Sequence, residues 1–121
     1  MRARIVLWVA VGAYLSIIFA LSAQPNPLPA LTAVVWDKLL HAAEYGGLGL
    51  LLNAALRASG LPARRAFVLA LAGASLYGAS DELHQLFVPG RDSEVLDWVA
   101  DTVGGGIGAA ATTLIATLRD R

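Results

Sequence analysis

The sequence has no cysteine and little charge. None of its 121 residues is Cys, and only 15% are Asp, Glu, Lys or Arg. The absence of cysteine excludes a disulfide framework and a thiolate metal site. With 57% apolar residues and a mean hydropathy of +0.63, the chain is too apolar for a typical soluble domain of this length. The composition predicts a membrane protein, and its zero formal net charge gives no reason to expect a nucleic-acid partner.

Four long apolar runs alternate with short polar or proline-containing connectors. They predict spans at about residues 5–23, 37–56, 66–88 and 94–118. A helical span takes about 20 residues, so the chain holds about four and leaves no room for a second domain. The first run is longer than the apolar part of a signal peptide, so we expect it to remain as a span. The predicted fold is therefore one all-α domain, residues 1–121, with four transmembrane helices.

Basic residues are unevenly distributed between the two sides of these spans. Two of them, Lys38 and Arg91, fall on one side. The other side carries Arg2, Arg4, Arg57, Arg64, Arg65, Arg119 and Arg121. Because Lys and Arg near span ends favour the cytoplasm, we expect both termini to be cytoplasmic. The alternative, a soluble helical bundle, would need polar stripes along whole helices, whereas here polar residues gather at one end of three spans.

These gathered polar residues share helix faces. A rotation of about 100° per residue groups Asp37, His41, Glu44 and Tyr45 on one span, Asp81, His84 and Gln85 on the next, and Asp97 and Asp101 on the last. A rise of about 1.5 Å per residue puts the groups in one layer, although Glu82 points about a quarter-turn away. Gly104 and Gly108 form a G-x-x-x-G that predicts close approach of another helix.

We interpret this layer as a pocket that opens outward, with Lys38 and Arg91 at its rim. Single residues have simpler explanations: Asp37 suits a helix cap, Lys38 can extend to the interface, and Asn53 suits polar packing. So many costly ionisable groups within spans exceed what packing requires, which favours a functional pocket. The predicted pocket residues are Asp37, Lys38, His41, Glu44, Tyr45, Asp81, Glu82, His84, Gln85, Arg91, Asp97 and Asp101.

Three stretches of the sequence carry a family resemblance. Residues 37–45, DKLLHAAEY, resemble a D-K-x-x-H-x-x-x-Y motif, and residues 80–91, SDELHQLFVPGR, are similar to S-D-E-x-H-Q-x-F-x-P-G-R. Residues 97–104, DWVADTVG, resemble a third motif in which Asn often replaces Asp101. All three are motifs of the VanZ-like family, small bacterial membrane proteins named for a protein of glycopeptide-resistance clusters. The resemblance implies a multi-pass protein of the bacterial cytoplasmic membrane, linked to teicoplanin resistance and the cell envelope, but supplies no reaction.

Three functions are open from the residues. The first is binding of membrane lipid, cell-wall precursor or glycopeptide; eight acidic residues against two basic ones in the outer layer favour an amine- or cation-bearing ligand. The second is a metal-dependent intramembrane hydrolase acting on a lipid or envelope substrate. Its divalent metal ligands would be His41, Glu44, Asp81, His84 and Asp97. The third is proton-coupled transport. Against it, the cytoplasmic halves of the spans carry almost no ionisable groups that could form a polar path.

Overall fold

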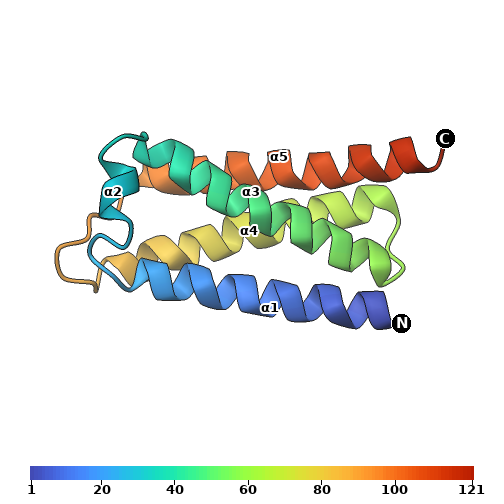
Figure 1. Ribbon diagram of the computed structural model, residues 1–121, viewed down its shortest axis with the longest axis horizontal. Coiled ribbons are helices and arrows are strands. Elements are labelled where there is room, and N and C mark those ends of the chain that lie inside the picture. Colours follow the sequence, from blue (N-terminus) through green and yellow to red (C-terminus); the bar gives the residue numbers. More distant parts are fainter.

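Four long helices and one short helix form the chain. In the computed structural model, which describes all 121 residues, they are α1 (Arg2–Ser22), α2 (Pro29–Thr32), α3 (Asp37–Ala58), α4 (Ala63–Gln85) and α5 (Val95–Arg119). The long helices lie side by side and alternate in direction (Figure 1). The all-α prediction is therefore confirmed. Two of these helices, α1 and α5, are long and apolar enough to cross a membrane.

The helix boundaries differ from the predicted ones near the polar end. Helix α4 ends at Gln85 rather than near residue 88, because the next residues form tight turns in which Phe87 N–H donates to His84 O and Val88 N–H to Gln85 O. Pro89 disfavours helical backbone in the residue before it, so the helix unwinds ahead of it. Gly90 then turns the chain with a φ of +78°. Helix α2, with Pro29 at its first position, was not predicted.

Glycines bring α3 and α5 close together. The G-x-x-x-G motif predicted a close approach of some helix to α5, and the structure identifies that helix as α3. A Cβ at Gly104 would collide with the backbone of Ala42, and one at Gly108 with the carbonyl of Gly46. Gly49 of α3 lies in the same way against the backbone of Gly105. This close approach holds the polar ends of the two helices together.

The interior is unusually polar and the exterior unusually apolar. Eight polar or charged residues are buried, against nine hydrophobic ones. Large apolar side chains on the outside are exposed, including Val9, Leu76 and Ile107 at 66%, 72% and 65%. Such an exterior suits lipid contact better than water, where large exposed apolar surfaces favour association.

Both termini and the α3–α4 connection lie at one end of the bundle, while α2 and the α4–α5 loop lie at the other (Figure 1). Seven arginines lie at the end with the termini, because they belong to the two chain ends and to the α3–α4 connection. The acidic residues, except Asp120, belong to the opposite end or the adjoining helix turns. We call this opposite end the acidic end.

Candidate functional site

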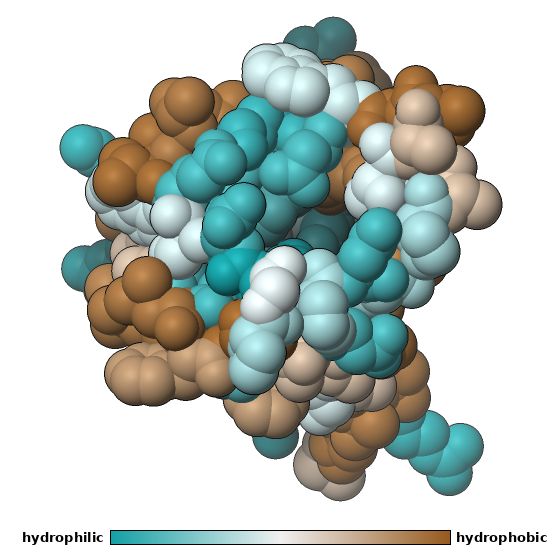
Figure 2. Space-filling view, turned by 90° about the vertical axis from the view of Figure 1, so that its left-hand side faces the viewer, coloured by the Kyte–Doolittle hydropathy of each residue, from teal (hydrophilic) through white to brown (hydrophobic).

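A pocket of about 120 Å³ lies at the acidic end. On this face, hydrophilic residues gather in the middle around a hollow, and hydrophobic residues surround them (Figure 2). Eight of the 13 residues that line the pocket are polar or charged. The pocket is lined by Leu21, Ser22, Pro25, Asn26, Pro27, Leu28, Thr32, Asp37, Leu40, His41, Glu44, Asp81 and Arg91.

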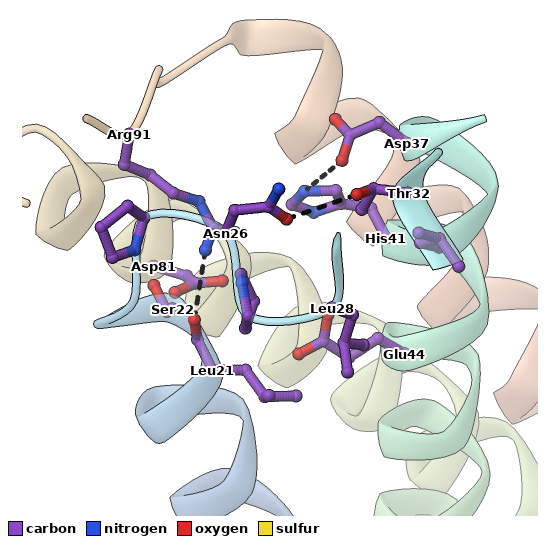
Figure 3. A pocket seen from close by; sticks show the side chains of 13 residues that line it. Leu21, Ser22, Asn26, Leu28, Thr32, Asp37, His41, Glu44, Asp81 and Arg91 are labelled. Atoms are coloured by element: carbon purple, nitrogen blue, oxygen red, sulfur yellow. Dashed lines mark hydrogen bonds and ion pairs between the residues drawn. The ribbon is translucent and has the colours of Figure 1, made fainter. Parts of the chain in front are cut away.

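The ionisable groups of the pocket come from two helices and a loop. Asp37, His41 and Glu44 follow one another at helical spacing on α3, and Asp81 reaches the pocket from α4 (Figure 3). Arg91 comes from the loop that follows Pro89-Gly90. The sequence predicted all five of these residues as pocket residues.

The connector between α1 and α3 supplies the remaining wall, which the sequence did not predict. Arg91 donates hydrogen bonds to the carbonyls of Leu21 (3.1 Å) and Gln24 (2.8 Å), and Thr32 donates one to the Asn26 side chain (3.3 Å; Figure 3). These bonds hold the proline-rich connector against the pocket. Its three prolines indicated only a break between helices, and Ser22, Asn26 and Thr32 carried no further signal.

Two acids in the pocket have no cationic partner. The Glu44 carboxylate makes no hydrogen bond or ion pair, although its backbone carbonyl accepts one from Tyr14. Asp81 Oδ2 accepts a hydrogen bond from buried Tyr45 at 3.1 Å and has no Lys or Arg within 4.0 Å. Arg91 donates to two backbone carbonyls and forms no ion pair with the pocket carboxylates. The pocket therefore has excess negative charge.

Lys38 and His41 join α3 to the start of α5. The Lys38 ammonium lies 2.6 Å from Asp97 Oδ1 and 2.7 Å from Glu94 Oε2. His41 Nδ1 is 2.8 Å from Asp101 Oδ1, and its Nε2 is 3.7 Å from Asp97 Oδ2. Four of the predicted residues thus form one connected network beside the pocket.

Asp37 does not cap its helix. Trp36 is the N-cap residue and Asp37 is the first helical residue, with no side-chain cap bond at that end. Its carboxylate instead lies 3.3 Å from Lys38 Nζ and 3.9 Å from His41 Nε2. The cap prediction is therefore wrong, because the nearby cation and imidazole bind the carboxylate instead.

Glu82 is buried, although helical geometry suggested that it faces elsewhere. It is only 8% exposed, and its Oε2 accepts hydrogen bonds from Ser93 Oγ and the Glu94 N–H, both at 3.1 Å. Helix α4 contacts both α3 and α5, so residues a quarter-turn apart on it are both covered. The side chain fastens the α4–α5 loop.

His84 and Gln85 lie against α1 rather than in the pocket. The His84 ring stacks on Phe19 with centroids 4.7 Å apart, and its Nδ1 is 3.4 Å from Ser22 Oγ. Buried Gln85 donates to the same hydroxyl at 3.3 Å. The structure therefore does not bring His84 to the other predicted metal ligands.

Two other groups of side chains have metal-ligand geometry. Asp37, His41 and Asp97 form one, and His41, Glu82 and Asp101 form the other. Within each group the ligand atoms all lie within 4.8 Å of one another. Neither Glu82 nor Asp101 was among the predicted metal ligands.

The fold and the site together define a class of protein: a helical bundle with an apolar exterior, buried carboxylates and a polar pocket at one end. Residues 5–116 match the model of the VanZ/LLP1 family, so the chain belongs to this family. Comparisons with curated proteins and with solved structures gave no match. Family membership and the two apolar helices point to a membrane protein.

Proposed function

We propose that α1, α3, α4 and α5 all span the bacterial cytoplasmic membrane, with both termini in the cytoplasm and the pocket open to the outside. Helices α3 and α4 have 22 and 23 residues, or about 33–35 Å, which is enough to cross a hydrocarbon core of about 30 Å. The buried polar residues of these helices, among them His41, Asn53 and Asp81, are covered by neighbouring helices and do not face lipid. The seven arginines at the opposite end favour a cytoplasmic location for that end.

We further propose that the pocket binds an amine or another cationic group of a cell-envelope lipid or wall precursor. The observation that carries this proposal is that Glu44 and Asp81 line the pocket without a Lys or Arg within 4.0 Å. A cation 4 Å from one carboxylate gains about 4 kcal/mol at an effective dielectric constant of 20, before desolvation is counted. A bare phosphate would meet repulsion from the same carboxylates.

The size of the pocket limits which part of a ligand it takes. A cavity needs about 10–15 Å³ to hold one water, so a pocket of 120 Å³ accommodates several waters or a small polar group. A complete lipid, wall precursor or glycopeptide is far larger. The pocket therefore takes a headgroup, and the rest of the ligand lies outside it.

The family supplies the biological setting of the proposal. We infer that binding of an envelope molecule at this pocket contributes to glycopeptide tolerance, including tolerance of teicoplanin. Hydrolysis is less well supported than binding, because His84 stacks on Phe19 of α1 instead of completing the predicted metal set.

Calorimetric titration of the purified protein in lipid nanodiscs tests this proposal. The probes are phosphatidylethanolamine, a lipid-linked wall precursor and teicoplanin, each compared with its N-acetylated form where it carries a free amine. We expect saturable binding of at least one amine-bearing probe and at least tenfold weaker binding after Asp81→Asn or Glu44→Gln, a loss of about 1.4 kcal/mol.

Asp92→Asn is the matched control for this titration. Asp92 is an exposed acid of the α4–α5 loop that does not line the pocket, so its amide should leave the affinity unchanged. Absence of saturable binding for every probe would refute the proposal. Equal affinity of the wild type, Asp81→Asn and Glu44→Gln would refute it as well.

A further inference from the structure

Two buried carboxylates in the structure each have one oxygen bound and one oxygen free. Asp101 Oδ1 lies 2.8 Å from His41 Nδ1, and Glu82 Oε2 accepts from Ser93 Oγ and the Glu94 N–H. The other oxygens, Asp101 Oδ2 and Glu82 Oε1, are buried and have no hydrogen-bond partner. Buried polar atoms are normally paired, so two such oxygens on neighbouring helices need a binding partner.

The two carboxylates converge with one imidazole, and each of the three side chains comes from a different helix. His41 of α3, Glu82 of α4 and Asp101 of α5 place their ligand atoms within 4.8 Å of one another. Their exposed fractions are 5%, 8% and 0%. We call these three residues the buried triad.

A glycine on α4 lets Asp101 approach this helix. Gly78 precedes Glu82 by four residues and so shares its helix face. A Cβ at Gly78 would lie 3.1 Å from Asp101 Oδ2, which is tighter than ordinary contact. The free oxygen of Asp101 is therefore next to α4, on the side where Glu82 is found.

We propose that the buried triad binds one divalent cation of the borderline class, such as Zn²⁺ or Mn²⁺. An imidazole with two carboxylates is a ligand set that suits these ions. Ligand atoms around Zn²⁺ lie about 3.4 Å apart, so the ion draws the three side chains closer together. Ser93 and the Glu94 N–H hold the second oxygen of Glu82, as outer partners do for metal-binding carboxylates.

The other group with metal-ligand geometry already contains a cation. The Lys38 ammonium lies 2.6 Å from Asp97 and 3.3 Å from Asp37, so it forms an ion pair with each carboxylate. In contrast, no Lys or Arg nitrogen lies within 4.0 Å of Glu82 or Asp101. Because no Lys or Arg occupies the buried triad, it is favoured over Asp37, His41 and Asp97 as the metal site.

This metal site does not depend on the ligand proposed for the pocket. His41 is the one residue that the buried triad shares with the pocket lining. A cation bound there would hold α3, α4 and α5 together beside the pocket. Metal binding can therefore fail or succeed independently of headgroup binding.

Metal titration of the full-length protein tests the proposal. The protein, purified in detergent and stripped with a chelator, is titrated with Zn²⁺ or Mn²⁺, and bound metal is measured by mass spectrometry after desalting. We expect one ion per chain. Glu82→Gln and Asp101→Asn should each weaken binding at least about 100-fold, which is the upper end of the loss seen when only an outer partner is removed.

Two further variants locate the ion. Asp92→Asn, on the exposed loop, should retain the wild-type metal affinity. Asp37→Asn tests the competing group and should weaken binding less than tenfold. A 100-fold loss in Asp37→Asn without a loss in Glu82→Gln would overturn the buried triad, and metal binding that no variant weakens would be adventitious and would also overturn it.

Infrared spectroscopy of the wild type keeps the proposal testable if either triad variant does not fold. A proton is the other partner that can satisfy a free carboxylate oxygen. Glu44 and Asp81 also lack a Lys or Arg partner and can carry a proton, so spectra recorded with and without metal are subtracted to leave only the groups that the metal changes. The proposal expects a shift of carboxylate stretching bands in this difference spectrum. A difference spectrum without a carboxylate change, or a wild-type protein that binds no metal, would overturn the proposal.

Discussion

Lys38 is the residue whose environment differs most from its simplest explanation. A lysine at the start of a span commonly extends to the membrane interface. Here its side chain is 15% exposed, and its ammonium lies within 3.3 Å of carboxylates of Asp37, Glu94 and Asp97. Of these three carboxylates only that of Asp97 is buried, with 5% of its side chain exposed. The ion pair between Lys38 and Asp97 therefore contributes most to stability.

Replacing Lys38 by Met should therefore destabilise the protein. Loss of the ammonium leaves the buried Asp97 carboxylate without its cation, at a cost of about 3 kcal/mol, while the half-exposed carboxylates contribute little. Denaturant unfolding in detergent, followed by circular dichroism, measures this change in the free energy of unfolding.

The double variant Lys38→Met with Asp97→Asn controls for the lost packing of the lysine side chain. It removes both charges and should recover most of the loss. If the single and the double variant are equally stable, the ion pair with Asp97 does not stabilise the fold.

Sequence periodicity predicted the pocket residues of α3 better than those of α4. Residues spaced three or four apart share a face, which correctly grouped Asp37, His41 and Glu44. The same rule grouped His84 with Asp81 but gave no information on which neighbouring helix each would meet. His84 contacts Phe19 of α1, a helix without acidic residues that carried no signal of a polar contact.

Asn53 shows where the simpler explanation is right. Its buried amide donates to Ala109 O at 2.6 Å and to Thr113 Oγ1 at 2.9 Å, both on α5. The predicted role as a polar packing contact is confirmed. It lies nine residues beyond Glu44 on α3 and does not line the pocket.

At the scale of the elements, the sequence predicted the glycine face of α5 but not the helix that packs against it. The G-x-x-x-G of Gly104 and Gly108 predicted a close approach, and small residues of this kind let two backbones meet. The partner was not predicted, because the glycines of α3 that meet α5, Gly46 and Gly49, do not have the G-x-x-x-G spacing. Pairing requires knowledge of both faces, which a single helix does not provide.

A single methyl group at this contact should destabilise the bundle. In Gly108→Ala, the added Cβ collides with the backbone of Gly46, and overpacking of this kind costs about 1–3 kcal/mol. The thermal unfolding midpoint in detergent should fall accordingly.

Gly12→Ala on α1 is the matched control, because a Cβ there meets nothing within 4 Å. It should leave stability unchanged or raise it by up to about 1 kcal/mol, since Ala favours helix more than Gly. Equal effects of the two substitutions would contradict the proposed close contact.

The connector between α1 and α3 was the least predictable element. Its prolines exclude a long helix, and this part of the prediction was right. Its place over the pocket depends on hydrogen bonds from Arg91, which is more than sixty residues away along the chain. No local pattern encodes such a distant contact.

For the whole molecule, the distribution of charge and apolar surface gives one consistent arrangement. Arginines gather at the end with the termini, and the acidic pocket lies at the other end, with exposed apolar side chains along the helices between them. Four spans with the pocket facing outward account for all three features. This orientation is the central claim, because access to envelope molecules depends on it.

Cysteine labelling in intact cells tests this claim most directly, since the natural chain contains no cysteine to interfere. Asp92→Cys places a thiol on the exposed loop at the acidic end, and Ala58→Cys places one on the exposed end of α3. A membrane-impermeant maleimide should label Asp92→Cys in intact cells and Ala58→Cys only after permeabilisation. Labelling in the reverse order, or equal labelling of both in intact cells, would contradict the outward-facing pocket.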